Sequence, residues 1–292
     1  MEDMRRSGFY HVCTNGTVLP WMFLDEPDFI SGINRIGICK IIAGVMVFAY
    51  SLMDNHVHFL LYGTYAQCLK FINKYKFLTG IRIAQRHHQN KHIKNLPVSI
   101  IPLKTEEDIL EVVAYIDRNA MMSGFKGLPH EYQWSSSRLL FKEDCRVTAG
   151  EFKVGDFSRN QLRDLLKTRV TLPDEWTFDE RGMLNPACFT EWQKVEDLFR
   201  SAVRYLYFVT KKLEGKIDMT LNQGHDSFIS DKDLRIITSD LCLKEFGEPD
   251  IRKLSVSSRL KLARTLRKEY SSTRKQIGRM LHLDAKILEG FI

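Results

Sequence analysis

The thirteen-residue run AYSLMDNHVHFLL (residues 49–61) places two apolar segments on either side of a polar Asp54-Asn55 pair. Asp and Asn favour tight turns, and two apolar segments joined by such a turn predict an antiparallel hairpin. The first segment belongs to a β-prone stretch, residues 40–53, which is interrupted at Gly44. Two long adjacent apolar strands predict the centre of an antiparallel sheet.

The second segment of this hairpin carries two histidines at alternate positions, His56 and His58. Side chains on a strand alternate between its faces, so both imidazoles project from one face, close enough to hold one metal ion. Imidazole is a common ligand of divalent metals, and two imidazoles leave coordination positions open for a substrate oxygen. The alternative is a pair of half-exposed sheet residues that bind nothing.

The flanking sequence completes an α+β pattern. Residues 8–14 read as a strand that ends at the turn pair Asn15-Gly16, and residues 28–35 as a helix. Residues 67–88 predict a basic amphipathic helix, and residues 106–122 a second helix in which Thr105 is the N-cap and acids fill the first turn. The expected fold is an antiparallel sheet covered by helices on one side, close to the split βαβ (ferredoxin-like) pattern. The apolar positions expected on the first of these two helices are Leu69, Ile72, Phe77 and Ile81.

Beyond residue 137 the strand signals become rare and the chain looks all-α. We place a domain boundary near residue 150, which makes residues 1–150 the first domain, residues 151–250 a helical connecting region and residues 251–292 a separate segment. Breaks at 171–174 and 185–186 divide the helical stretches. Those stretches are 158–169, 189–213, 230–246 and 257–270.

Composition limits the class of protein. The 292 residues are 44% hydrophobic and contain no apolar run long enough to span a membrane. Residues 1–6 lack the apolar core of a signal peptide. The six cysteines are scattered singly, which argues against a structural zinc site or a disulfide framework and predicts a cytoplasmic protein. A net charge of +7 favours a polyanionic partner, nucleic acid first.

The helix expected at 106–122 carries a candidate nucleophile. Its apolar stripe leaves Tyr115 about 100° from the centre of the buried face. Asn119 lies one turn later on the same side as Tyr115. The alternative is an amphipathic tyrosine at the rim of the core, with its hydroxyl in solvent.

Two strand histidines followed by a helical Tyr-x-x-x-Asn resemble the single-tyrosine HUH transposases, in particular the REP-associated tyrosine transposase family. The resemblance covers residues 8–141, about half of the chain. It rests on four motifs in the family's order: Phe9-Tyr10-His11-Val12, residues 49–61, Tyr115-Ile116-Asp117-Arg118-Asn119 and Trp134-Ser135-Ser136.

This resemblance implies a site and a reaction. His56, His58 and Asn119 would bind Mg²⁺ or Mn²⁺, and Tyr115 would attack a DNA phosphate to give a 5′-phosphotyrosine link. Asp54 stands where the family usually has proline, and Ala120 replaces the proline usual after Asn119. The segment 92–97 lacks the family's Gly-Arg motif, which puts DNA contacts from that region in doubt. His11, on the first strand, is left out of the ligand set because an ordinary strand histidine is the simpler interpretation.

Basic residues supply two further predictions. On the helix at 67–88 they are expected to meet DNA phosphates without reading sequence; they are Lys70, Lys74, Lys76, Arg82 and Arg86. Near the carboxy end, a basic helix from Ser258 and a capping-box pattern at Thr273 predict a helix-turn-helix over 251–292, with Arg274, Lys275 and Arg279 as DNA contacts. The alternative is a basic helical bundle used for packing or for dimer contacts.

The function expected from the sequence is a metal-dependent, transposase-like endonuclease and strand transferase that acts on single-stranded, hairpin-containing DNA. The carboxy-terminal segment could add duplex DNA binding, and homodimerisation is left open. Two alternatives of the same fold remain: a hairpin-DNA-binding protein that no longer cleaves, and a transcriptional regulator that acts through the helix-turn-helix.

Overall fold

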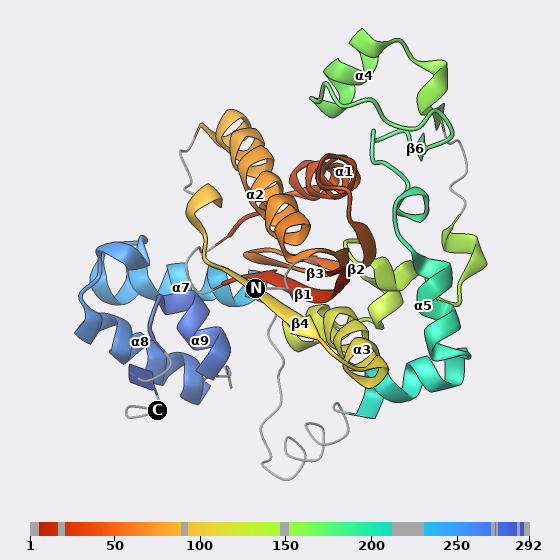
Figure 1. Ribbon diagram of the computed structural model, residues 1–292. Helices are drawn as coiled ribbons and strands as arrows, with labels where there is room; N and C mark the ends of the chain where they lie inside the picture. The colour runs from red at the N-terminus through yellow and green to blue at the C-terminus, as the bar shows by residue number, and fades with distance from the viewer. Residues whose placement is uncertain are drawn as a thin grey trace.

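The computed structural model describes residues 6–16, 21–88, 93–146, 152–211, 231–269, 272, 274–284 and 287–288. Its first half is an α+β unit built on a four-stranded antiparallel sheet with the strand order β2-β3-β1-β4 (Figure 1). In chain order, the elements are β1 (Gly8–Thr14), α1 (Glu26–Ala43), β2 (Met46–Met53), β3 (His56–Gly63), α2 (Tyr65–His87), β4 (Val98–Leu103) and α3 (Glu106–Met122).

The predicted hairpin is confirmed, since β2 pairs with β3 across the Asp54-Asn55 turn, with Met53 opposite His56. The turn is held from outside by the backbone N–H of Phe23, which donates to the carbonyl oxygen of Asp54 at 2.9 Å. The other edge of β3 pairs with β1, which places two strands that are 40 residues apart in the chain at the centre of the sheet.

Helices cover both faces of the sheet, which corrects the expectation of a one-sided cover. α1 and α2 pack on the face that carries Val12 and Phe59, whereas α3 packs on the opposite face, against Ala49 and Leu60. Figure 1 shows α1 and α2 above the sheet and α3 below it. The physical reason is that every β3 residue from His56 to Leu61 is buried, so neither face of this strand is left to water.

The β-prone stretch that begins at Lys40 is only partly a strand. Residues 40–43 form the last turn of α1, which is therefore longer than the expected helix at 28–35. Gly44 ends that helix in the left-handed conformation, with φ of 69°, which glycine adopts without steric cost. β2 starts only at Met46.

The apolar positions expected on α2 are mostly on its exposed side. Ile72 is buried, but Leu69, Phe77 and Ile81 are exposed. The helix carries two apolar rows, and the row that faces α1 and the sheet is not the one expected from the sequence. Its buried members are Cys68, Phe71, Ile72, Tyr75, Thr79 and Ile83.

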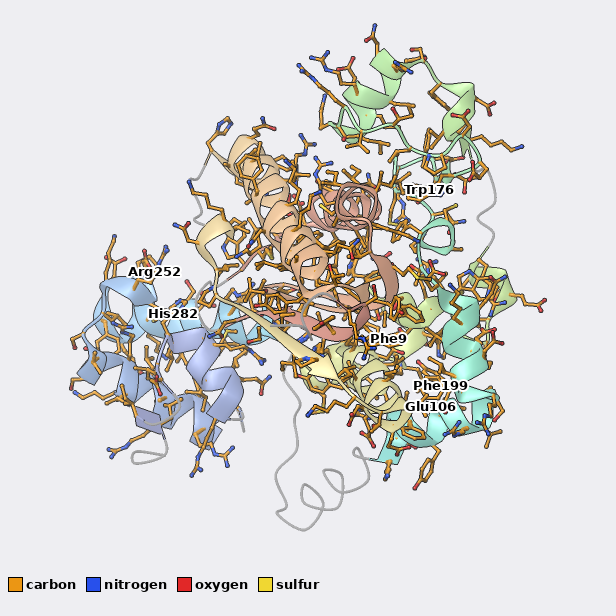
Figure 2. The ribbon with its side chains drawn as sticks, viewed as in Figure 1. Phe9, Glu106, Trp176, Phe199, Arg252 and His282 are labelled. Carbon is orange, nitrogen blue, oxygen red and sulfur yellow. The ribbon has the colours of Figure 1, made fainter. Side chains whose placement is uncertain are left out.

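Residues 152–211 pack against the first unit. Trp176 (labelled in Figure 2) and Phe189 belong to the same hydrophobic cluster as α1 and the sheet. Arg118 of α3 donates to the carbonyl oxygen of Phe208 at 2.6 Å. The core thus continues across the expected boundary near residue 150. The helices and strands here are β5 (Phe152–Lys153), α4 (Arg159–Leu166), β6 (Thr177–Phe178), α5 (Trp192–Phe199) and a helical stretch at 202–211.

The carboxy-terminal helices α7 (Asp231–Phe246), α8 (Val256–Glu269) and α9 (Arg274–Leu281) form a hydrophobic cluster of their own. A Cβ atom on Gly278 of α9 would lie 3.2 Å from the carbonyl oxygen of Leu283, so this close approach leaves little room for a side chain. The capping box expected at Thr273 lies outside the described residues. Short 3-10 helices occupy Ile93–Asn95, Pro129–Glu131, Ser136–Leu139, Glu143–Cys145, Val154–Asp156, Pro186–Cys188 and Ile251–Lys253.

Within the described part of the chain, none of the helices is both long enough and apolar enough to cross a membrane.

Candidate active site

The candidate site is built on the face of the sheet that packs against α3. Along β3 the side chains on this face are those of His56, His58, Leu60 and Tyr62, because alternate residues share a face. Leu60 is part of the hydrophobic cluster under α3, and Tyr62 packs at its edge. The two histidines therefore continue an apolar row into a polar end, next to the β2–β3 turn.

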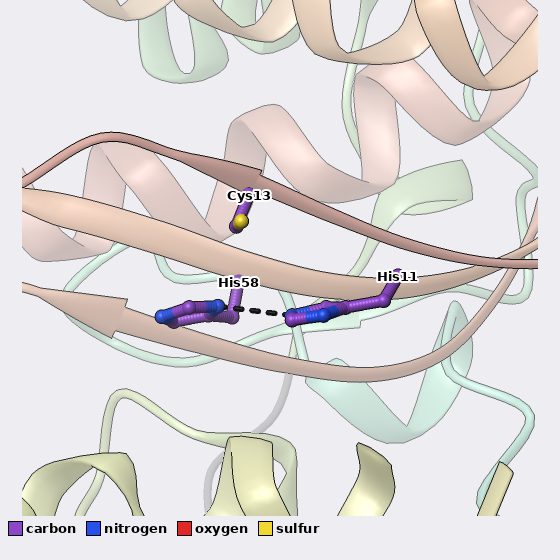
Figure 3. Close-up of side chains that lie close together, drawn as sticks. All are labelled: His11, Cys13 and His58. Carbon is purple, nitrogen blue, oxygen red and sulfur yellow. Dashed lines mark hydrogen bonds between the residues drawn. The ribbon is translucent and has the colours of Figure 1, made fainter. Parts of the chain in front are cut away.

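Strand β1 adds two side chains to the same end of the sheet. Cys13 lies opposite His58 in the β1–β3 register, and His11 is two residues earlier on the same face. The Nε2 atom of His11 lies 3.1 Å from Nδ1 of His58 (Figure 3). The possible ligand atoms of His11, Cys13 and His58 all lie within 4.8 Å of one another.

His11 was left out of the ligand set and Cys13 was missed from the sequence, both for a physical reason. The His-x-Cys spacing on residues 11–13 is a usable signal, because it places both side chains on one face of a strand. The strand's register against β3 is a tertiary contact between residues 47 positions apart. Without that register, nothing in the local pattern brings this pair to His58.

The turn before β3 orients His56. Its Nδ1 lies 2.7 Å from the Oδ1 atom of Asn55. An amide oxygen only accepts, so His56 donates its proton from Nδ1 and keeps the lone pair on Nε2 for a metal ion. The side-chain amide of Asn55 in turn donates to the carbonyl oxygen of Gly16 at 2.9 Å, which fixes the amide's orientation.

The contact between His11 and His58 determines what His58 can bind. Burial lowers the pKa of His11 to about 4, so His11 is neutral at pH 7. One N–H is then shared between Nε2 of His11 and Nδ1 of His58. When His58 donates from Nδ1, its Nε2 atom carries the lone pair that can bind a metal ion.

Tyr115 of α3 lies over this histidine cluster. Its ring centroid is 5.4 Å from that of His58 and 5.7 Å from that of His11, with edge-to-face geometry in both pairs. The residue is 36% exposed, so the phenol is packed on one side and open to solvent on the other. The structure thus brings together His56, His58 and Tyr115 as the sequence predicts.

The pKa of Tyr115 is raised, chiefly because partial burial disfavours the phenolate, and Cys13 adds to this effect. A hydrogen bond from Asn119 and the positive charges of Arg279 and Arg118 act in the opposite direction. The protein alone therefore leaves the phenol protonated at neutral pH, and its ionisation requires further positive charge in the site.

Asn119 is placed one turn after Tyr115 and is buried. Its Nδ2 donates to the carbonyl oxygen of Tyr115 at 3.1 Å. Asn119 does not line the cleft that contains His56, His58 and Tyr115. Its role as a metal ligand stays a prediction.

A cleft of about 310 Å³ joins these groups. Arg279 of α9 also lines this cleft and is only 5% exposed. The carboxy-terminal helical unit therefore contributes a cation to the same cleft as the histidines and the tyrosine. The lining residues are Cys13, Thr14, Asn15, Gly16, His56, His58, Pro97, Ser99, Tyr115 and Arg279.

The Trp134-Ser135-Ser136 segment of the fourth motif lies against the outer edge of β2. The backbone N–H of Leu52 donates to the carbonyl oxygen of Trp134 at 3.0 Å. The N–H of Tyr50 donates to Oγ of Ser136 at 2.9 Å. This segment covers one part of the sheet edge, and Thr190 bridges to another part of it at Val47. The segment does not line the cleft.

Two of the five basic residues expected to meet DNA from α2 are already engaged within the protein. Lys76 is buried, and its Nζ donates to the carbonyl oxygen of Leu96 at 2.7 Å. Arg86 forms ion pairs with Asp25 and Asp28. These two residues are withdrawn as phosphate contacts, because both side chains support the packing of α2.

The other basic residues remain candidates. On α2, Lys70 is exposed, whereas Lys74 and Arg82 are half-buried. On α9, Arg274 is exposed and Arg279 points into the cleft. The side chain of Lys275 lies outside the described residues.

Comparison of the chain with protein-family models, with curated proteins and with solved structures found no match. The proposal of a function therefore depends on the site itself and on the sequence motifs.

Proposed function

We propose that this protein is a metal-dependent single-strand DNA endonuclease and strand transferase of the single-tyrosine HUH type, similar to the REP-associated tyrosine transposases. One observation carries the proposal: the Tyr115 ring packs edge-to-face on His58, in a cleft that also contains His56 and Arg279. A nucleophile, metal-binding imidazoles and a phosphate-binding cation within one cleft are the groups that phosphodiester transfer needs.

The fold supports this proposal. The element order β1-α1-β2-β3-α2-β4 with strand order β2-β3-β1-β4 is compatible with the split βαβ (ferredoxin-like) arrangement that the family resemblance implies. α3 follows the sixth element and packs on the free face of the sheet, which is where its tyrosine can meet the strand histidines.

The donor set fits a divalent cation. His56 can present Nε2 to an ion because its Nδ1 faces the Oδ1 atom of Asn55, and His58 can present Nε2 when its Nδ1 donates to Nε2 of His11. A bound Mn²⁺ or Mg²⁺ would polarise the scissile phosphate and stabilise charge on its oxygens. Imidazole nitrogen binds transition metals more strongly than it binds Mg²⁺, so these ligands fit Mn²⁺ better.

The chemistry of the residues follows from their positions. The phenolic oxygen of Tyr115 attacks phosphorus and forms the new oxygen–phosphorus bond. The bond from phosphorus to the 3′ oxygen breaks, and this oxygen takes up a proton while the phenol loses one. Because the phosphotyrosine link keeps the bond energy of the phosphodiester, attack by a free 3′-hydroxyl reverses the step and joins strands without ATP.

We further propose that α8 and α9 act as a helix-turn-helix that binds DNA next to the cut. Support comes from the close packing at Gly278 and from the eight Lys and Arg residues between 257 and 281, against one acid. Arg279 of α9 lines the cleft that contains Tyr115, so DNA bound by this unit would lie next to the proposed nucleophile.

The proposal is tested with purified protein, Mn²⁺ and single-stranded hairpin DNA labelled at either end. We expect a denaturation-resistant protein–DNA adduct that carries the strand 3′ of the cut, together with a free 3′-hydroxyl on the other fragment. A shift of the DNA in a native gel without any adduct would favour the cleavage-inactive binding protein. Tight binding of duplex DNA alone, again without an adduct, would favour the regulator.

Arg279 supplies a separate prediction. Replacement by Gln removes a charge-assisted hydrogen bond to the scissile phosphate, which is worth about 1.5–3 kcal/mol. We therefore expect Arg279→Gln to slow single-turnover cleavage by about 10- to 100-fold. Arg274→Gln, an exposed change on the same helix, is the matched control and should leave the rate of the bound complex unchanged. Equal slowing by both substitutions would assign Arg279 to general DNA binding instead.

A further inference from the structure

A second cleft, with a volume of about 300 Å³, lies between α1, α2 and residues 165–182. It is on the side of the sheet covered by α1 and α2, opposite the side that carries Tyr115. Four of the side chains that line it are basic, and Glu26 is the only acidic one. The basic side chains are those of Arg35, Arg82, Lys167 and Arg181.

The innermost of these residues is Arg35, which is 4% exposed. Its Nη1 donates to the carbonyl oxygen of Leu166 at 2.6 Å. Its Nε is buried and has no hydrogen-bond partner among the described residues. No carboxylate in the described part of the chain lies within ion-pair distance of it. A buried guanidinium without a counter-charge is costly.

The remaining cations divide into two kinds. Arg181 is neutralised, since it pairs with Asp179 at 2.8 Å and with Glu26 at 2.6 Å. For Arg82 and Lys167, by contrast, the described residues provide no carboxylate within 4.0 Å. Burial is the main cause of the lowered pKa of Arg35, and the positive charge of Arg82 lowers it further. These cations repel one another, and a bound anion would relieve the repulsion.

We propose that this cleft binds a phosphate group, held by Arg35, Arg82 and Lys167. The planar guanidinium fork matches phosphate oxygens in charge and geometry. A basic cleft of this size accommodates either a free phosphate or one phosphate of a DNA backbone. The chemistry is shared by both sources, and the proposal does not depend on the nuclease function.

A purely structural role accounts for only part of this arrangement. One contact of Arg35 is structural, because its Nη1 donates to the carbonyl oxygen of Leu166 at the end of α4. That contact uses Nη1 and leaves Nε without a partner. It also gives no reason for Arg82 to face the same cleft from a different helix.

The test is calorimetric titration of the full-length protein with inorganic phosphate at constant ionic strength and without added metal. We expect saturable binding that weakens about tenfold in Arg82→Gln and in Lys167→Asn, since each change removes one charge-assisted bond. Asn tolerates the left-handed backbone that Lys167 adopts, with φ of 50°. Lys126→Gln, which removes an exposed charge from the loop after α3 and outside the cleft, is the matched control.

Equal weakening by Lys126→Gln, or the absence of saturable binding in the wild-type protein, would overturn the proposal. A second titration, with the hairpin oligonucleotide, distinguishes the source of the phosphate. If Arg82→Gln also weakens binding of the oligonucleotide and free phosphate competes with it, the site takes a backbone phosphate. If binding of the oligonucleotide is unchanged, the site takes a small phosphate.

Discussion

Tyr115→Phe should abolish the covalent protein–DNA adduct and reduce strand cleavage by about 10⁴-fold or more, the scale seen when a catalytic nucleophile is removed. The substitution deletes one oxygen atom and keeps the ring that packs on His58 and His11. The fold and the cleft therefore persist, and the affinity for hairpin DNA should stay within about twofold, because a single hydroxyl contributes little. Denaturing gels report the adduct, and native gels report the binding.

Tyr207→Phe is the matched control for this experiment. Tyr207 is exposed on the helical stretch at 202–211 and does not line the cleft. Its loss of the same hydroxyl should leave cleavage unchanged. Cleavage that persists in Tyr115→Phe at the wild-type rate would exclude this tyrosine as the nucleophile.

The sequence predicted best those elements that local signals define. The strand at 8–14 and the helix at 106–122 have the predicted bounds. A turn pair marks the end of the strand, and the helix begins at a capping box on Thr105. These signals act over a few residues, so no knowledge of the tertiary structure is needed to use them.

Features that depend on packing were predicted poorly. β4 was not anticipated, because it is an edge strand with alternate exposed residues and a proline at position 102. On α2, Leu69, Phe77 and Ile81 form one apolar row at intervals of four or eight residues, yet it faces solvent. Periodicity alone cannot tell which of two rows meets the core when both are apolar.

In the candidate site, too, only the features defined by local signals could be predicted from the sequence. His56 and His58 share a strand, so their proximity follows from alternation alone. Their contact with Tyr115 was anticipated only from the family motif. The approach of His11 and Cys13 requires the β1–β3 register. Arg279 enters the cleft from a helix near the carboxy end of the chain, far in sequence from Tyr115 and both histidines, which no local pattern can anticipate.

His58→Ala should abolish metal-dependent cleavage by a different route from the tyrosine substitution. The change removes one imidazole from the proposed ligand set and also the bond between His58 and His11. Direct titration with Mn²⁺, followed by the signal of the free ion in electron paramagnetic resonance, measures the loss of metal affinity without DNA. We expect the same result for His56→Ala, and no change for His130→Ala, which lies outside the cleft.

Asn55→Ala should weaken Mn²⁺ binding by an intermediate amount. Asn55 touches no metal in the proposal; its Oδ1 accepts from Nδ1 of His56 and thereby orients the ring. Loss of such a hydrogen bond behind a ligand typically costs about 10–100-fold in metal affinity, whereas loss of either histidine should cost more. We therefore expect the Mn²⁺ affinity to be highest in the wild type, lower in Asn55→Ala and lowest in His56→Ala and His58→Ala. This order is expected only if the two histidines bind the ion. An unchanged Mn²⁺ affinity in both histidine variants would instead make them ordinary sheet residues, and Tyr115 would then need another source of positive charge to ionise.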